Sequence, residues 1–220
     1  MGLGVPTGQQ DIHENIGLVP DPAYMQRVNQ RDWSVADTLN LVIGQGDTQV
    51  TPLQVARMVA AIANGGTFFE PLLVSRVQSP GANPSYTVQA EPTSTLDYSP
   101  VVFETIRRAM CDVTVDSHGT ARFVFEEWYP YQRANGYNVV VCGKTGTAQT
   151  GGENTPPQAW FAAFAPQENP EIAVVVIVEN SCEGSEVAAP IARRIIEDYY
   201  GMPHSEWPPL WQTGCSTLGE

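Results

Sequence analysis

One short stretch decides how this chain folds: residues 139–149 read VVVCGKTGTAQ. The three valines before Cys142 are typical of a buried β-strand, because β-branched side chains pack well on a pleated surface. Lys144 is the only lysine of the chain, whereas ten arginines carry the rest of the positive charge. We infer that an ammonium group is needed here, on or at the end of a strand and beside the hydroxyls of Thr145 and Thr147.

Two further apolar runs follow this motif, at residues 159–165 and 172–179. With residues 139–147 they predict three strands. The connections at 151–157 and 166–171 are rich in Gly, Pro and Asn and suit hairpins, so the sheet is predicted to be antiparallel.

Helices are predicted before and after these strands in the sequence. Thr51 and Pro52 are a typical cap and first helical residue, and the helix they open ends at 64–66, where the sequence reads NGG. A second helix is predicted from Ser99 to about 113 and a last one over about 186–200. Helices packed on an antiparallel sheet make the predicted fold class α+β.

The remaining segments carry weaker signals. Residues 1–50 are rich in glycine and proline and are expected to be mainly loop. A strand is expected at 72–77, followed by a surface excursion over 78–97. The stretch Gly119-Thr120-Ala121 predicts a tight turn into a short helix.

Bulk composition limits the possible functions. The 220 residues are 42% hydrophobic and 16% charged, as in a globular domain, and carry a formal charge of −13. Such a charge argues against a nucleic-acid partner, because phosphate contacts need clustered Lys and Arg. It also argues against adhesion to an anionic membrane surface. No apolar run approaches the roughly 20 residues of a membrane span, and no signal peptide is visible.

The four cysteines and three histidines show no metal-ligand spacing. We therefore expect no metal and no organic cofactor, and free buried thiols at all four cysteines.

Gly143-Lys144-Thr145 invites comparison with a phosphate-binding loop. That motif, G-x-x-x-x-G-K-[ST], needs glycine at position 138, which is Asn138 here, whereas Gly136 comes two residues too early. The intervening residues are mostly valines of a strand, so nucleotide binding is disfavoured.

The alternative is a K-T-G strand, which β-lactamases and penicillin-binding proteins place beside a serine nucleophile. The ammonium of Lys144 suits a substrate carboxylate, and the hydroxyls of Thr145 and Thr147 can donate hydrogen bonds to it. Gly146 keeps side-chain bulk away where a substrate would lie along the strand. A backbone N–H of such a strand can form half of an oxyanion hole.

Other stretches strengthen this interpretation by their order and spacing. They are IGQG at 43–46, TPLQVA at 51–56, ANGGT at 63–67, GTA at 119–121, GKTGTAQ at 143–149, WFAAFAP at 160–166 and EN at 179–180. Together they resemble the C-terminal part of class B penicillin-binding proteins, the peptidoglycan transpeptidases, over about residues 2–201. The elongation-type subgroup is favoured.

The resemblance implies a penicillin-binding/β-lactamase-like fold, with a five-stranded antiparallel sheet flanked by helices. Lys144, Thr145, Gly146 and Thr147 would bind the carboxylate of a D-alanyl-D-alanine stem peptide or of a β-lactam. Lys144 and the Thr147 backbone N–H, as an oxyanion donor, would take part in catalysis. The Gly-Gln-Gly and Thr-Pro-Leu-Gln segments would be structural.

The sequence departs from the family at two motifs. S-x-x-K is absent, because three residues before the only lysine stands Val141, and no serine has asparagine two residues later, so S-x-N is absent too. Thr38-Leu39-Asn40 has a similar spacing, which we attribute to chance. We therefore expect residues 1–201 to be the C-terminal portion of a transpeptidase domain whose N-terminal part is missing. The sheet face that this part covers in the family is expected to be exposed and apolar.

The tail at 202–220, rich in Pro and Trp, is predicted to be irregular and docked by Trp207 and Trp211.

Two hypotheses about function follow. In one, the chain belongs to a transpeptidase of the extracytoplasmic face of the bacterial inner membrane, anchored by a segment outside this chain, and needs the missing half and the cell-wall machinery as partners. In the other, it is a non-catalytic module that binds cell-wall peptides or a partner protein. A β-lactamase is disfavoured, since no deacylating glutamate is recognisable.

Overall fold

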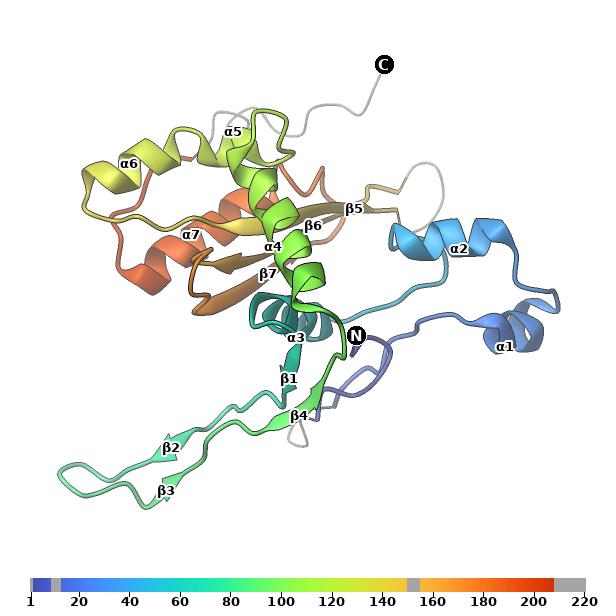
Figure 1. Cartoon of the computed structure of the whole chain (residues 1–220), viewed down its shortest axis with the longest axis horizontal. Helices are drawn as coiled ribbons and strands as arrows, with labels where there is room; N and C mark the ends of the chain where they lie inside the picture. Colours follow the sequence, from blue (N-terminus) through green and yellow to red (C-terminus); the bar gives the residue numbers. More distant parts are fainter. Residues whose placement is uncertain (1, 9–12, 150–154, 208–220) are drawn as a thin grey trace.

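The computed structural model of the chain describes residues 2–8, 13–149 and 155–207 (Figure 1). At its centre lies a sheet of three strands in the order β5-β6-β7: β5 (Cys142–Ala148), β6 (Gln158–Ala165) and β7 (Ile172–Val178). Both pairings are antiparallel, which confirms the predicted orientation. Among the residues that the structure describes, β5 pairs only with β6, so the lysine strand is an edge strand of this sheet. The described residues thus form three strands of this sheet, against the five implied by the resemblance.

The lysine strand begins later than predicted, at Cys142 rather than at Val139. The side chain of Gln132 bonds both the N–H and the carbonyl of Val139, at 2.8 and 2.6 Å. The Val141 carbonyl accepts a hydrogen bond from the Thr114 hydroxyl at 2.5 Å. Because helix side chains satisfy these backbone groups, residues 139–141 need no partner strand, and Val139 and Val141 are buried while Val140 is half-buried.

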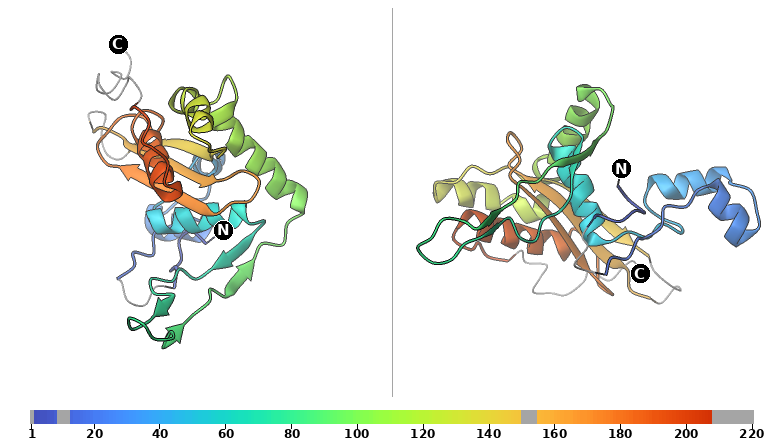
Figure 2. Two further views of the ribbon diagram at one scale, coloured as in Figure 1. Left: turned by 90° about the vertical axis from the view of Figure 1, so that its left-hand side faces the viewer. Right: turned by 90° about the horizontal axis from the view of Figure 1, so that it is seen from below.

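Helices lie on both faces of the sheet (Figure 2), and the side chains of the sheet alternate between two separate cores. On one face Phe161 and Ala163 pack with α5 (Arg122–Phe125), α6 (Trp128–Ala134) and α7 (Ala188–Tyr200). On the other face Ala162 and Phe164 pack with α3 (Pro52–Ala63) and α4 (Pro100–Val115). The predicted α+β class is confirmed.

The expectation of an exposed apolar sheet face is wrong. Trp160 and Ile177, on the side of α3 and α4, are half-buried, and no large apolar residue of β5, β6 or β7 is exposed. Element contacts explain this, because α3 packs against both β6 and β7.

Helix α3 forms where its caps predicted it. The Thr51 hydroxyl accepts a hydrogen bond from the Gln54 N–H, and the Gln54 side chain accepts one from the Thr51 N–H, which makes a capping box. Gln54 is buried, and its amide also donates to the carbonyls of Val5 and Ile16 at 2.8 Å each. The same side chain therefore starts the helix and ties the N-terminal segment to it.

The N-terminal fifty residues contain more helix than predicted. A short α1 (Pro22–Tyr24) continues into a π-helical turn, η1 (Met25–Asn29), and α2 (Val35–Val42) follows. Ser34 and Asp37 form a capping box that starts α2. Most of its large apolar side chains face solvent, with exposed fractions of 77% for Val35, 63% for Leu39, 78% for Val42 and 72% for the following Ile43, whereas Leu41 is half-buried.

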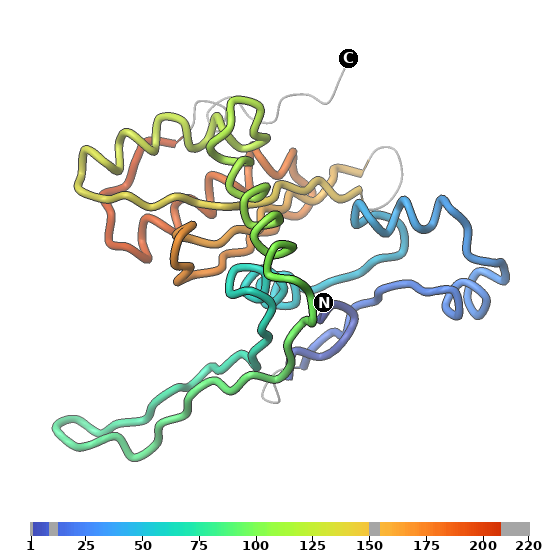
Figure 3. The backbone as a smooth tube through the Cα atoms, viewed as in Figure 1, coloured from blue at the N-terminus to red at the C-terminus, as the bar shows by residue number. Residues whose placement is uncertain are grey.

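A long β-hairpin arm projects from the body between α3 and α4 (Figures 1 and 3). Near the body β1 (Thr67–Phe69) pairs with β4 (Pro92–Thr95), and further out β2 (Arg76–Val77) pairs with β3 (Tyr86–Thr87). The strand predicted over 72–77 is confined to its last two residues. Residues 72–74 are exposed apolar side chains with no second layer to bury them.

The expectation of free thiols is wrong. Cys111 of α4 and Cys142 of β5 form a disulfide, although 31 residues separate them in sequence. Cys182 is disulfide-bonded as well. Cysteine spacing in the sequence can indicate a local metal site, but it does not show which distant cysteines meet in the fold. Here α4 lies across β5 and brings the pair together.

The last helix is α7, which ends at Gly201 in a left-handed conformation, φ 65°. Residues 202–207 then form neither helix nor strand, and Arg194 stacks over the ring of Trp207 at 4.6 Å from its centroid. The rest of the predicted tail, 208–220 with Trp211, lies outside the described residues.

No helix in the described part of the chain combines the length and the apolar character needed to cross a membrane.

Candidate functional site

A cleft of about 450 Å³ opens beside the lysine strand. Four segments meet there: strand β5, the residues that follow α2, the turn before α5 and the turn before α7. The residues that line it are Ile43, Gln45, Thr120, Lys144, Thr145, Gly146, Thr147, Glu183, Gly184 and Ser185.

Strand β5 presents its motif to this cleft along its length. Lys144 and Thr147 are exposed, and Thr145 and Gly146 are half-buried. Since side chains alternate along a strand, Thr145 and Thr147 share one face, and Lys144 lies on the other. The Lys144 ammonium donates a hydrogen bond to the Thr145 carbonyl at 2.6 Å. One cation and two hydroxyls therefore stand within four consecutive residues.

The turn before α5 supplies a third hydroxyl. The Oγ1 atoms of Thr120 and Thr145 lie 2.9 Å apart, so the two hydroxyls share a hydrogen bond. Gly119 allows this approach, because a Cβ there would lie 2.4 Å from the carbonyl oxygen of Asp112 in α4. The end of α4 thus places Thr120 against the lysine strand.

Two glycines bring other parts of the protein close to β5. A Cβ at Gly143 would lie 2.4 Å from the ring of Phe161. A Cβ at Gly184 would lie 2.1 Å from the carbonyl oxygen of Trp160 and 2.5 Å from that of Gly146. The turn at 183–185 is therefore in direct contact with the backbone of β5 and β6, which only a residue without a side chain permits.

The cleft contains one cation and one anion that are not paired with each other. Neither Lys144 nor Glu183 takes part in an ion pair among the described residues. Both side chains are exposed. Two residues after Glu183, Ser185 is only 7% exposed and lines the same cleft.

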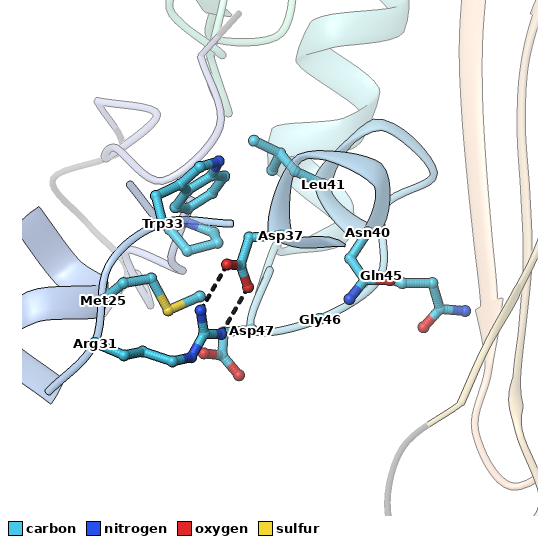
Figure 4. Close-up of a pocket in the computed structure, with 10 residues that line it drawn as sticks. Met25, Arg31, Trp33, Asp37, Asn40, Leu41, Gln45, Gly46 and Asp47 are labelled. Carbon is cyan, nitrogen blue, oxygen red and sulfur yellow. Dashed lines mark hydrogen bonds and ion pairs between the residues drawn. The ribbon is translucent and has the colours of Figure 1, made fainter. Parts of the chain in front are cut away.

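A second pocket, of about 150 Å³, lies between η1 and α2 (Figure 4). Two of its three charged groups bind one another: the Arg31 guanidinium donates to both carboxylate oxygens of Asp37 at 2.7 Å, and the third, Asp47, accepts a hydrogen bond from the Asn29 amide at 3.3 Å. The hydrogen bonds from Arg31 and from Ser34 hold the pKa of Asp37 far below its usual range. Because these groups satisfy each other, we interpret this pocket as structural.

The structure brings the four predicted site residues together in one cleft, while their roles stay predictions. Gln45 of the Gly-Gln-Gly segment was expected to be purely structural and lines the cleft instead. Sequence reasoning also missed Thr120 as a site residue, although it lies in one of the stretches that carry the resemblance. Nothing local in the sequence marks the turn at 183–185. Within the described ranges, no group of three or more His, Cys, Asp or Glu side chains could hold a metal ion.

An α+β domain whose edge strand carries Lys-Thr-Gly beside an open cleft is typical of the penicillin-binding and β-lactamase class. Comparison with known proteins agrees: the chain belongs to the penicillin-binding protein transpeptidase domain family, whose model matches residues 1–197. Peptidoglycan D,D-transpeptidase MrdA of Haemophilus influenzae is 32% identical over 212 residues. That match covers 90% of this chain and 31% of the relative, so the chain spans about a third of the length of this relative.

Solved structures give the same family. Pseudomonas aeruginosa PBP2 in complex with WCK 5153 is 31% identical with a TM-score of 0.73, covering 94% of this chain and 43% of that one. The imipenem acyl-enzyme complex of penicillin-binding protein A from Mycobacterium tuberculosis is 33% identical with a TM-score of 0.61, covering 76% and 34%. The complex of PBP2 with MreC from Helicobacter pylori is 28% identical with a TM-score of 0.68, covering 90% and 34%. The predicted family is confirmed, with elongation-type PBP2 proteins among the structural neighbours.

Proposed function

We propose that this chain forms the carboxylate-binding wall of a serine D,D-transpeptidase that cross-links peptidoglycan, and that it is inactive by itself. One observation carries the proposal: Lys144, Thr145 and Thr147 line the same cleft on an edge strand. An ammonium and neighbouring hydroxyls are donors suited to a carboxylate, and charge-assisted hydrogen bonds are the stronger kind.

The edge position of β5 also allows the strand to bind the backbone of a ligand. Alternate residues of an edge strand leave N–H and carbonyl groups unpaired. A substrate backbone or a β-lactam can lie along these groups, with Gly146 leaving room above the strand. In this arrangement the Thr147 N–H would stabilise the negative charge that develops on the attacked carbonyl oxygen.

The chemical step needs a group that this sequence does not contain. Acyl transfer requires a serine activated by a nearby base, and the only lysine lies on β5 without a serine three residues before it. We therefore propose that a second portion of the transpeptidase supplies S-x-x-K and S-x-N. The alternative, a non-catalytic module that binds cell-wall peptides or a partner, uses the same wall without that portion.

The relatives support the ligand and partner classes. The acyl-enzyme complex with imipenem points to β-lactams as ligands, and the PBP2–MreC complex points to partners in the cell-wall machinery. The disulfide between Cys111 and Cys142 supports a location on the extracytoplasmic side of the bacterial inner membrane, because disulfides persist in oxidising compartments.

Intact mass after incubation with a reactive penicillin tests the missing nucleophile. We expect no covalent adduct on the 220-residue chain. A stoichiometric adduct mapped to one of its serines would overturn this part of the proposal.

Titration of the chain with acetyl-D-alanyl-D-alanine, followed by the NMR signals of residues 144–147, tests the carboxylate wall. Replacing Lys144→Ala should weaken binding about tenfold, since hydrogen bonds to charged groups contribute about 1.5–3 kcal/mol. Arg133→Ala is the matched control, because it removes an exposed cation from α6. Equal affinity of the Lys144→Ala variant and the wild type would remove Lys144 from the site.

A further inference from the structure

A closed ring of hydrogen bonds holds the chain just before the lysine strand. The Val141 N–H donates to the Tyr129 hydroxyl at 3.3 Å, and the Thr114 hydroxyl donates to the Val141 carbonyl at 2.5 Å. The two hydroxyls lie 2.8 Å apart. Because Thr114 gives its only proton to the carbonyl, Tyr129 is the donor between the hydroxyls. Each hydroxyl then donates once and accepts once, and hydrogen bonds in such a chain strengthen one another.

A second ring lies two residues earlier, where the Gln132 side chain bonds both backbone groups of Val139. Tyr129 and Gln132 are three residues apart on α6 and so lie on the same side of this helix. In an antiparallel sheet, alternate residues bond one neighbouring strand through both backbone groups. Helix α6 thus takes the place of a partner strand for residues that come before the pairing with β6, which starts at Cys142.

We propose that Tyr129 and Thr114 are positioning residues, which hold the start of β5 so that residues 144–147 keep one arrangement in the cleft. Neither residue is among those that line the cleft, so both act through Val141. The inference rests on the proposed function, because the arrangement matters only where these side chains bind a ligand.

The lysine strand needs such support, since in the described part of the chain only β6 pairs with it. Thr114 belongs to α4, whose Cys111 is bonded to Cys142 and whose end places Thr120 against Thr145. The ring, the disulfide and the threonine contact thus hold successive points of one stretch of chain. Donors that are already held in place lose less freedom when a ligand binds, and this raises affinity.

The surroundings of the ring allow one hydroxyl to be removed cleanly. Thr114 is 1% exposed, and the Tyr129 ring packs against Phe125 and Trp128 with centroids 6.0 and 5.5 Å apart. Burial raises the pKa of Tyr129, so its hydroxyl keeps its proton at neutral pH. Tyr129→Phe therefore opens the ring and leaves the aromatic contacts in place.

Titration with acetyl-D-alanyl-D-alanine, followed by the NMR signals of residues 144–147, tests the inference. We expect the affinity of the folded Tyr129→Phe variant to fall about threefold to tenfold, as for the loss of one hydrogen bond. A merely structural contact would change stability and leave this affinity unchanged. Tyr131→Phe is the matched control on α6 and should bind like the wild type, because the Tyr131 hydroxyl bonds the His204 carbonyl at 3.2 Å instead.

A closed ring also predicts how two substitutions combine. Thr114→Val opens the same ring, so its combination with Tyr129→Phe should bind about as weakly as the weaker single variant. Thr114→Ser keeps the hydroxyl and should restore most of the affinity. Losses that add in full would show two independent contacts and overturn the shared ring on which the inference rests.

Amide hydrogen exchange gives a readout that needs no ligand. In Tyr129→Phe the N–H groups of residues 141–145 should exchange faster than in the wild type. The Val139 N–H, which bonds Gln132, should keep its rate. Unchanged exchange over residues 141–145 would mean that the ring does not hold the strand, and would overturn the inference.

The outcomes distinguish the inference from the proposed function. A Tyr129→Phe variant that binds the peptide as tightly as the wild type overturns the positioning role and leaves the carboxylate wall standing. A wild-type chain that does not bind the peptide overturns the carboxylate wall, and the positioning role with it.

Discussion

Single residues decide how closely other segments approach the lysine strand. Gly184 is the tightest case, because a Cβ there would overlap backbone atoms of Trp160 and Gly146, which cannot rotate away as a side chain can. At Gly146 itself the nearest atom to an added Cβ is the Trp160 Cβ, at 3.3 Å. The two glycines of the cleft should therefore tolerate a methyl group very differently.

We predict that Gly184→Ala lowers the free energy of unfolding by about 1–3 kcal/mol, as overpacking does, because the turn must move off the strand. Gly146→Ala should lower the free energy of unfolding by clearly less. Urea unfolding followed by tryptophan fluorescence measures both. Equal stability of Gly184→Ala and the wild type would mean that the turn is not fixed against β5.

The shared hydrogen bond between Thr120 and Thr145 gives a second prediction at this scale. Thr120→Val keeps the shape of the side chain but removes the hydroxyl that orients Thr145. Affinity for acetyl-D-alanyl-D-alanine should fall about threefold to tenfold, in line with a net hydrogen bond of about 0.5–1.5 kcal/mol. Thr120→Ser should restore most of the affinity, and a Thr120→Val variant with wild-type affinity would exclude a positioning role.

The site residues differ in how far the sequence predicts them. Lys144, Thr145 and Thr147 follow from a local motif, because their neighbours in space are also their neighbours in sequence. Glu183 reaches the cleft only because the turn before α7 lies on β5, which no local pattern indicates. Thr120 is intermediate, since its stretch is recognisable but its contact with Thr145 is not.

Among the structural elements, the disulfide joins the two that carry the site. Cys111 lies in α4, whose end positions Thr120, and Cys142 is the first residue of β5. Cross-linking two residues stabilises a protein mainly by restricting its unfolded chain. The pair therefore holds the lysine strand against the helix that lies across it.

Replacing Cys111→Ala and Cys142→Ala together should lower the free energy of unfolding by about 3–4 kcal/mol, the value expected for a sequence separation of 31 residues. Thermal unfolding with and without a reducing agent measures the effect. Cys182 is also disulfide-bonded. If a reducing agent still lowers the thermal stability of the double variant, that loss of stability belongs to the disulfide of Cys182. Unchanged stability of the oxidised double variant would contradict the prediction.

The sequence predicts well those elements that have a capping residue with a periodic apolar pattern, or a long apolar run. Helix α3 has its Thr51 cap and apolar stripe, and β6 and β7 are long apolar runs within the central sheet. Helix α2 was missed because glycines and prolines dominate its surroundings, although Ser34 and Asp37 are a readable capping pair. Residues 72–74 look like a strand but lie on the arm, where nothing buries them.

For the molecule as a whole, two Arg–Glu pairs at i,i+4 spacing allow a buried ion pair to be compared with an exposed one. Arg193 and Glu197 are 5% and 0% exposed, whereas Arg122 and Glu126 are 33% and 55% exposed. The buried Glu197 also accepts hydrogen bonds from the Trp128 indole, at 2.8 Å, and from Ser205 in the last described segment. Glu197 thus connects α6, α7 and that segment in one network.

We predict that Glu197→Ala costs about 3–5 kcal/mol of stability, because it leaves buried partners uncompensated. Glu126→Ala should cost less than about 1 kcal/mol, as exposed pairs do. Chemical denaturation of both variants at neutral pH measures the difference. Similar losses in the two variants would show that burial does not set the strength of these pairs.

Acid stability should depend on the ion pair of the N-terminal region. The pKa of Asp37 is depressed by Arg31 and Ser34, so its contribution to stability is complete above the ordinary aspartate pKa of about 3.9 and is lost as the pH falls toward the depressed value. Asp37→Asn should therefore be less stable than the wild type at pH 7, and the difference should shrink below about pH 4. Urea midpoints across this range check the sign, and a difference that grows in acid would contradict it.

The β-hairpin arm makes the protein convenient for imaging and assembly experiments. Its outer part carries exposed residues on both strands, β2 and β3. These strands lie far from the lysine strand β5 (Figure 1). Exposed loop tips accept insertions with little effect on the fold. A fluorophore or peptide tag can be placed at Gly81, where an added Cβ meets no atom within 4 Å. Such a tag would report the location of the protein and its binding partners while the lysine strand stays unlabelled.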